Sequence, residues 1–263
     1  MSRRLAELEA ALGESLFSRG VQGAALTSFG ERLAEPARRM AEGAAELARV
    51  AEHRDPTPRG VVRLTAPPGL AFDFVAPFAV FLRKKLPGVR LEVIATLRYL
   101  DLVRREADLA IRFRKPTQHD LVTVAEYTTG IAAFASRAYA AKLRPGYGLR
   151  DIDWIGWAPP LDDLSPNPEL AAAIPDFRPV FASDDFLIQV RAAEAGMGAI
   201  VLARAWHRFT RLGLLTPLAV DLGPVEAGAF VVTTRSALAI PRVRAVADLL
   251  ASEFRQVRKS PFK

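Results

Sequence analysis

The chain has 263 residues, of which half are hydrophobic and a quarter are charged, as in a globular protein with one large domain or two modest ones. It has no cysteine, which excludes disulfides and thiolate chemistry, and no run of about 18 uncharged apolar residues, so no membrane-spanning helix is expected. The three histidines are scattered without paired spacing, so we expect neither a metal site nor a cofactor. The first residues lack the apolar run of a signal peptide, and we expect a cytoplasmic protein that does not bind membranes.

The net charge of +7 is distributed unevenly along the chain. Residues 1–54 contain eight Arg and eight Glu but no Lys or Asp, so this segment is neutral and the whole excess of positive charge follows it. The basic composition therefore gives no support for DNA binding by the N-terminal segment.

The first thirty residues predict a helix, a short hairpin and the start of a second helix. Leucines recur at helical spacing before Gly13, which stands where a helix-ending glycine belongs. Apolar pairs then flank a loop with two glycines at residues 18–23, which suits a hairpin. Either Thr27 or Ser28 is expected to cap the second helix.

This arrangement resembles the latter part of the winged helix-turn-helix of LysR-type transcriptional regulators. The residues that match the family in order and spacing are Ser2-Arg3-Arg4, Leu8-Glu9, Leu12-Gly13, Leu16-Phe17, Arg19, Leu26-Thr27 and Gly30. An intact member would place its recognition helix in the major groove and its wing on the phosphate backbone. The resemblance implies that the DNA-binding surface includes Ser2, Arg3, Arg4 and Arg19.

The match departs from the family at its start. Further helices normally precede this run, which begins inside the recognition helix, whereas here only Met1 precedes Ser2. The resemblance therefore implies a winged helix-turn-helix that is truncated at its front, and so short a helix is marginally stable alone. We expect the chain as given to bind operator DNA weakly or not at all, and to bind DNA if the missing N-terminus is restored.

Residues 28–53 predict one long helix. Its apolar residues recur with a period near the ~3.5 residues of a coiled coil, at Phe29, Leu33, Ala37, Met40, Ala44, Leu47 and Ala51. This seam favours pairing with a second chain, and in the family the matching helix mediates dimerisation, so we expect a homodimer or homotetramer. The alternative is an amphipathic helix that packs on its own chain. Pro36 is expected to disturb the helix.

Residues 55–60 contain two prolines and a glycine and predict a hinge. They separate a partial winged helix-turn-helix with its linker helix, at residues 1–54, from a domain at residues 61–263. In that domain strand and helix patterns alternate in β-α-β-α-β order, which indicates a parallel sheet. The predicted strands are 61–66, 90–95, 108–113, 121–128, 131–135, 180–182, 199–202 and 230–233. One predicted helix follows the turn at residues 67–69 and ends at Lys85, and the others span 99–106, 183–195 and 241–257.

This second region resembles the effector domain of the same family. The matching pieces are Gly60-x-Val62-Arg63-Leu64, Phe78, Phe81-Leu82, Leu86-Pro87-Gly88-Val89, Leu102-Val103, Asp108-Leu109-Ala110-Ile111-Arg112, Ser183-Asp184-Asp185 and Ala195-Gly196-Met197-Gly198. The implied fold is α/β, with a two-lobed effector domain like periplasmic binding proteins after the partial winged helix-turn-helix and the long linker helix. Lobe I is expected at about residues 61–132 and 236–263 and lobe II at about 133–235, with crossings near residues 132 and 235.

Ligands of open α/β sheets bind beyond the carboxyl ends of the strands. The residues at such ends make up the expected effector site: Pro68, Gly69, Leu70, Thr96, Arg112, Thr129 and Ser183. Gly69 would let the backbone approach a ligand, the hydroxyls would orient it, and Arg112 or Arg114 would neutralise a carboxylate. Each residue also has a simpler interpretation, namely a plain turn, a strand end, a helix cap at Ser183 or a solvated arginine. Many members of the family have Ser or Thr near residues 69–71, where this chain is apolar, which weakens the case for an amide-rich or strongly anionic ligand.

Catalysis finds little support, because the chain has no nucleophile elbow, no glycine-rich phosphate loop and no zinc-protease motif. We therefore do not expect an enzyme. The first hypothesis is a transcriptional regulator that responds to a small-molecule effector. One alternative is a stand-alone small-ligand-binding protein of the periplasmic type, which would not explain the motifs at residues 2–30. The other is a dimerising protein that inhibits intact relatives through the linker helix.

Overall fold

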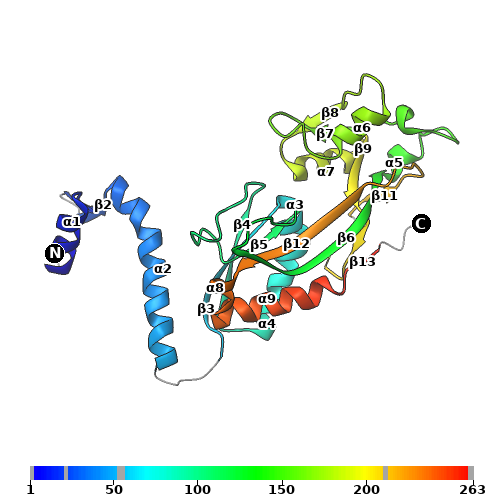
Figure 1. Ribbon diagram of the computed structural model, residues 1–263. Helices are drawn as coiled ribbons and strands as arrows, with labels where there is room; N and C mark the ends of the chain where they lie inside the picture. Colours follow the sequence, from blue (N-terminus) through cyan, green and yellow to red (C-terminus); the bar gives the residue numbers. More distant parts are fainter. Residues whose placement is uncertain (1–2, 21–22, 52–56, 210–212, 260–263) are drawn as a thin grey trace. The chain divides into compact units, whose positions relative to one another are not determined.

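The computed structural model describes residues 3–20, 23–51, 57–209 and 213–259. It divides into two compact units, Met1–Thr57 and Pro58–Lys263, whose elements are labelled in Figure 1. Within the described ranges no helix is both long and apolar enough to cross a bilayer.

The first unit has the expected order of helix, hairpin and helix. Its elements are α1 (Arg3–Leu12), β1 (Phe17–Gly20), β2 (Gly23–Leu26) and α2 (Ser28–Ala51). The strands pair antiparallel, with Phe17 opposite Leu26. The long helix runs through Pro36 without a break.

Three polar or small residues fix the local geometry of this unit. Glu9 Oε1 accepts hydrogen bonds from the backbone N–H groups of Leu16 at 2.6 Å and Phe17 at 3.2 Å, which ties α1 to the hairpin. Thr27 Oγ1 accepts from Gly30 N at 3.0 Å and so caps α2. A Cβ at Gly30 would collide with the carbonyl oxygen of Leu16, so only glycine allows this close approach.

Apolar side chains of this unit face solvent. The helix α1 buries none of its side chains, and Leu8 and Leu12 are 48% and 41% exposed. On α2, Met40 is 77% exposed. The described part of the unit therefore presents apolar side chains to solvent on both of its helices.

The second unit is built on a mixed seven-stranded sheet. Across the sheet the strands are β11 (Leu215–Pro217), β6 (Leu121–Ser136), β12 (Glu226–Thr234), β5 (Leu109–Arg112), β3 (Gly60–Ala66) and β4 (Val89–Ala95), and β9 (Ala199–Ala203) pairs with β6. As predicted, β3 is parallel to both β4 and β5. The later strand β12 is antiparallel to β5 and β6.

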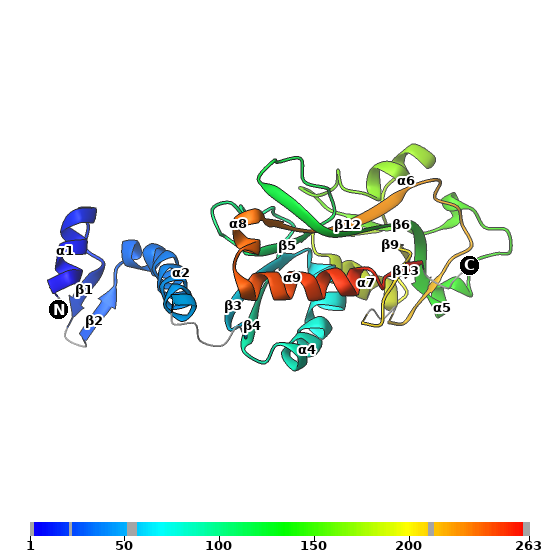
Figure 2. The ribbon, with the colours of Figure 1, turned by 60° about the horizontal axis from the view of Figure 1, so that its bottom comes forward.

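Lobe I packs helices against β3, β4, β5, β12 and the first part of β6. These helices are α3 (Pro68–Leu70), the π-helical η1 (Ala71–Val75), α4 (Ala76–Lys85), α8 (Arg235–Leu238) and α9 (Pro241–Phe254). Figure 2 shows α4 and α9 next to each other beside β3 and β4. The buried core joins Leu64 of β3, Phe78 of α4 and Leu250 of α9, each fully removed from solvent.

Lobe II contains the rest of β6 together with β9 and β11. Its other elements are α5 (Arg137–Ala140), η2 (Leu149–Asp151), β7 (Ile155–Trp157), α6 (Asn167–Ala173), β8 (Phe181–Ser183) and α7 (Phe186–Glu194). Phe134, Ile155 and Ile200 form part of its core. The two-lobed α/β architecture expected from the sequence is thus confirmed.

The expected helix at residues 99–106 is wrong. This segment forms a turn at residues 102–105, where Asp101 Oδ1 accepts hydrogen bonds from Val103 N at 2.9 Å and Arg104 N at 3.0 Å and Arg105 adopts a left-handed backbone with a φ of 59°. A residue in the left-handed region cannot continue a right-handed helix, so the helix does not extend past this turn.

Two expectations about the crossings between the lobes also need correction. The strands expected at 121–128 and 131–135 are one strand, since β6 pairs with β12 up to Gly130 and with β9 from Ile131 onward. The second crossing does not lie near residue 235. It precedes Glu226, because β12 already pairs with β6 opposite Gly130 at that residue.

A further passage between the lobes was not expected. After β9, residues 204–209, here called the strap, return to lobe I, where β10 (Ala205–Trp206) pairs with β13 (Arg258–Lys259). The guanidinium of Arg208 binds both carboxylate oxygens of Glu253 on α9, at 2.6 and 2.9 Å. Glu253 is only 2% exposed, and its Oε2 lies 3.1 Å from His207 Nε2.

Candidate functional site

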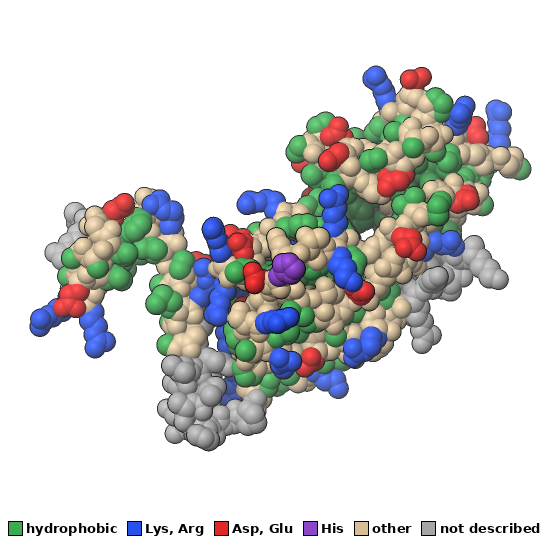
Figure 3. All heavy atoms as spheres, in the orientation of Figure 1, with side chains coloured by type: hydrophobic (Ala, Val, Ile, Leu, Met, Phe, Trp, Pro, Cys, Tyr) green, Lys and Arg blue, Asp and Glu red, His purple; other side chains and the backbone are tan. Residues whose placement is uncertain are grey.

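The carboxyl ends of the lobe I strands lie beside a recess. Ala66 at the end of β3 pairs with Ala95, and Thr96 N donates to Ala66 O at 3.0 Å. Pro68 then begins α3 directly after β3. The space-filling view shows a recess between the two lobes of this unit, bordered by hydrophobic side chains (Figure 3).

Gly69 is covered by an aromatic ring from lobe II. A Cβ at Gly69 would lie only 2.6 and 2.7 Å from two ring carbons of Phe186, the first residue of α7. The same ring stands 6.3 Å from the indole of Trp157, at an interplanar angle of 30°. Leu70 is half-buried and packs on the lobe I core. The backbone at Gly69 thus approaches a side chain of the chain itself.

Ser183 does not cap α7. The cap is Asp185, whose Oδ1 accepts from Leu187 N at 2.7 Å and Ile188 N at 3.3 Å. The hydroxyl of Ser183 is buried and accepts from Asp185 N at 3.1 Å, while its carbonyl accepts from Gln189 Nε2 at 2.7 Å. Ser183 therefore positions the start of the helix from the turn before it.

Arg112 is a buried cation at the end of β5, with 6% of its surface exposed. Its Nη2 donates to Leu100 O at 2.7 Å, and its guanidinium carbon lies 4.8 Å from the ring centre of Tyr99. In the described part of the chain its Nε has no hydrogen-bond partner. Burial lowers the pKa of Arg112, and Tyr99 and Asp101 oppose that shift. A guanidinium remains charged even so, and this one keeps a donor for a ligand anion.

The two threonines of the expected site are engaged within the chain. Thr129 is buried, and its hydroxyl donates to Arg204 O at 3.1 Å, which fastens the strap to β6 where β6 crosses between lobes. Thr96 Oγ1 accepts from Arg98 N at 3.1 Å and closes a local turn. Arg114 lies just beyond β5 and is exposed. Of the predicted residues, Arg112 keeps the clearest capacity for a ligand.

Sequence reasoning missed Asp73 and Phe186. Asp73 lies on η1, where burial, helped by the nearby Glu194 of α7, raises the pKa of its carboxyl to about 6. No local motif marks this residue, because its neighbour Glu194 lies far away in the sequence. A π-helical turn is a common feature of functional sites, but it has no sequence signature.

The predicted DNA-binding residues lie on the first unit. Arg3 and Arg4 are exposed on α1, and Arg3 Nε forms an ion pair with Glu7 at 3.2 Å. Arg19 belongs to β1, and its side chain is not among those described; Ser2 lies outside the described residues.

Among the described residues, neither a group of metal ligands nor an open depression lies at the expected effector site. Among the described residues no group of three His, Asp or Glu side chains is placed to hold a metal ion. One open depression of about 470 Å³ lies along α7, and another of about 460 Å³ lies between α4 and β4. None of the predicted effector residues lines either of them.

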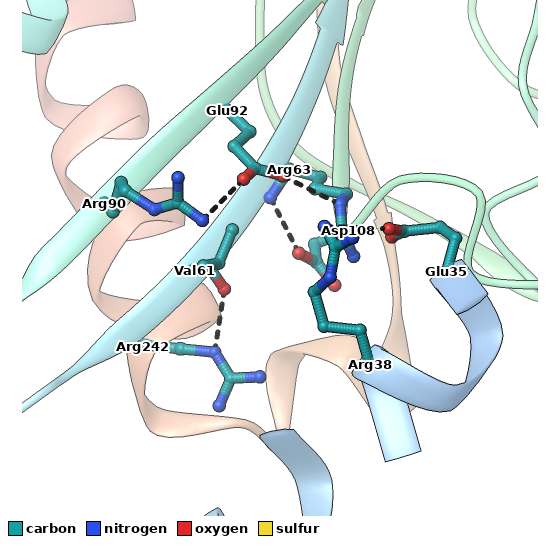
Figure 4. A network of polar contacts seen from close by, with 8 residues as sticks. All are labelled: Glu35, Arg38, Val61, Arg63, Arg90, Glu92, Asp108 and Arg242. Atoms are coloured by element: carbon teal, nitrogen blue, oxygen red, sulfur yellow. Dashed lines mark hydrogen bonds and ion pairs between the residues drawn. The ribbon is translucent and has the colours of Figure 1, made fainter. Parts of the chain in front are cut away.

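A polar network lies across β3, β4 and the start of β5, away from the carboxyl ends of these strands (Figure 4). Arg63 N donates to Asp108 Oδ2 at 2.8 Å, and Arg63 Nε pairs with Glu92 Oε2 at 3.0 Å. Arg242 Nε donates to Val61 O at 2.9 Å and so ties α9 to the start of β3. The family-like motifs around Arg63 and Asp108 thus hold three neighbouring strands in register.

Comparison with known proteins agrees with this architecture. The family model "LysR substrate binding domain" matches residues 56–255. The regulator CrgA of Neisseria meningitidis serogroup C is 28% identical over 144 residues, 54% of this chain and 48% of that protein. PtxR of Pseudomonas aeruginosa is 30% identical over 162 residues, 59% of this chain and 51% of that protein. The chain thus matches about half the length of these curated relatives.

A solved structure extends the likeness to nearly the whole fold. The structure of CrgA from Neisseria meningitidis superimposes with a TM-score of 0.62, at 21% identity, over 96% of this chain and 88% of that one. The relatives named here are transcriptional regulators and not enzymes. The family model covers most of the sequence, and the chain therefore belongs to the LysR substrate binding domain family.

Proposed function

We propose that the protein is a LysR-type transcriptional regulator whose second unit binds a small-molecule effector between its two lobes. Its membership of the family and the helix–hairpin–helix order of the first unit support this proposal. A regulator of this kind acts on DNA in the cytoplasm. The observation that carries the effector site is the buried Arg112 at the carboxyl end of β5, because its Nε is removed from water without a hydrogen-bond partner in the described part of the chain and can donate to an anionic ligand.

A small carboxylate is the effector that this arginine fits best. A carboxylate oxygen would accept a charge-assisted hydrogen bond from Arg112 Nε while Nη2 keeps its bond to Leu100. The apolar side chains of Leu100 and Phe230, which lie beside Arg112, favour a ligand whose remaining part is hydrophobic.

The test is a thermal-shift screen of aliphatic and aromatic monocarboxylic acids, followed by calorimetric titration of the acids that bind. We expect an acid that stabilises the wild type to stabilise Arg114→Met equally, because Arg114 is exposed. The same acid should lose at least about tenfold in affinity for Arg112→Met, since a charged hydrogen bond is lost. An acid that binds Arg112→Met as tightly as the wild type would contradict this site.

We also propose that the 263-residue polypeptide by itself binds operator DNA weakly. The exposure of Leu8 and Leu12 on α1 supports this, because a ten-residue helix that buries no side chain is poorly held for groove recognition. Purified polypeptide can be mixed with fragmented genomic DNA, recovered and the bound fragments sequenced. We expect at most a weak enrichment of any sequence, and a sharply enriched set of sites would overturn the expectation.

The proposed assembly is a homodimer or homotetramer. The exposed Met40 of α2 supports it, as does β4, which ends the described sheet and exposes Val93 and Ile94 at 41% and 36%. Light scattering after gel filtration measures the mass directly. Met40→Glu should shift the population toward monomer, and a wild type that is monomeric at micromolar concentration would contradict the assembly.

A further inference from the structure

The two lobes touch where the chain begins α3 and α7. Gly69 of α3 accepts the ring of Phe186 so closely that a Cβ there would stand 2.6 Å from a ring carbon. Phe186 in turn packs on the lobe II core and stands beside Trp157. The ring is therefore anchored in lobe II and rests on the backbone of lobe I.

An opposing interaction lies between α7 and η1, the segment that follows α3. Asp73 of η1 and Glu194 of α7 approach each other closely enough that the charge of Glu194 acts on the carboxyl of Asp73. Glu194 is also bound by Arg191 at 3.2 Å on its own helix. An apolar contact thus draws the lobes together at one place, and two acidic groups repel each other at another.

We propose that Phe186 is a gate: its ring, resting on Gly69, holds the lobes together, and the lobes separate when the ring leaves the glycine. The inference rests on the proposed effector site, because the backbone that the ring covers borders that site. An effector that enters the recess must displace the ring, so the energy of this contact sets how readily the sensor admits its ligand.

Two substitutions disrupt the contact between Gly69 and Phe186, one in each lobe. Phe186→Ala removes the ring, and Gly69→Ala adds a methyl group where the ring already stands. Leu187→Ala is the matched control, because Leu187 is the next residue of the same helix and is 37% exposed. If Phe186 is a gate, both substitutions should separate the lobes and Leu187→Ala should not.

The distance between the lobes can be measured by pulsed electron paramagnetic resonance. The chain has no cysteine of its own, so nitroxide labels can be placed through Ala171→Cys on α6 and Asp248→Cys on α9, both exposed. Dilution with unlabelled protein removes distances between subunits. In the full chain we expect Phe186→Ala and Gly69→Ala to move the distribution to longer distances, with the separated population raised about tenfold.

The outcome decides the proposal in every case. Longer distances in both variants, with Leu187→Ala like the wild type, support the gate. Unchanged or shorter distances in either folded variant would overturn it, as would an equal shift in Leu187→Ala. If Phe186→Ala unfolds lobe II, shown by a lower unfolding temperature, Gly69→Ala alone decides in the same way. No ligand is used, so a failure here leaves the carboxylate titration of Arg112 intact.

Discussion

The bond between the strap and α9 allows a quantitative prediction for Glu253→Gln. The carboxylate of Glu253 is 2% exposed, receives two hydrogen bonds from Arg208 and faces His207. The substitution keeps the shape and removes the charge. One of the two bonds from Arg208 then meets an amide NH₂ instead of an oxygen.

The magnitude follows from the burial of each partner. Breaking a fully buried ion pair costs about 3–5 kcal/mol, but the side chain of Arg208 is 46% exposed and can regain water. We therefore expect a loss of about 2–4 kcal/mol. For a domain of this size that corresponds to a decrease of about 5–12 °C in the unfolding temperature.

Urea unfolding followed by circular dichroism measures this loss. Asp248→Asn, an exposed carboxylate on the same helix, is the control and should change stability by less than about 0.5 kcal/mol. Arg208→Met should cost more than Glu253→Gln, because it leaves a buried carboxylate without its guanidinium. Replacing both with Met should restore much of the stability, since an apolar pair avoids desolvating charges. A Glu253→Gln variant as stable as the control would refute this reasoning.

Two further predictions concern Asp73 and Gly30. The folded-state pKa of Asp73, about 6, lies above its unfolded value of 3.8, so its protonation stabilises the fold at low pH and this stabilisation is lost as pH rises through about 6. The difference corresponds to about 3 kcal/mol at most, and to about 1–2 kcal/mol after allowance for partial exposure. Asp73→Asn should therefore be more stable than the wild type at pH 8 and equal to it near pH 4 in urea unfolding; parallel pH profiles would contradict this. Gly30→Ala should cost about 1–3 kcal/mol in the first unit, because its methyl group meets the Leu16 carbonyl, and should speed amide exchange over residues 16–31. Gly43→Ala is its control on the same helix, where a methyl group meets no atom within 4 Å, and should stabilise α2 by about 1 kcal/mol; equal exchange in the two variants would show that the Gly30 contact is unimportant.

Much of the fold could be predicted because it depends on local patterns. The β-branched run at β3 and the apolar spacing of α9 each identify an element whatever surrounds it. The cap at Asp185 was missed for a local reason as well, since the neighbouring Ser183 and Asp184 offered equally good alternatives. Sequence patterns therefore predict which element forms more reliably than they predict the residue at which that element begins or ends.

The site was harder to predict because it is assembled from distant parts of the chain. The contact of Gly69 with Phe186 joins two lobes, and no periodicity connects them. Arg112 was chosen as a strand-end arginine, but its burial under Tyr99 and Leu100 depends on a loop that the sequence suggested was a helix. The engagement of Thr129 with the strap depends on a passage between lobes that family-like motifs did not indicate.

The central claim is that this protein regulates transcription in response to a ligand held by Arg112. The most direct test compares transcripts of the source organism carrying the wild-type gene, a deletion, Arg112→Met or Arg114→Met at the chromosomal locus. We expect the deletion to change a small set of transcripts, and Arg112→Met to abolish their response to the identified carboxylate while Arg114→Met preserves it. Transcripts that are unchanged by the deletion would contradict the account.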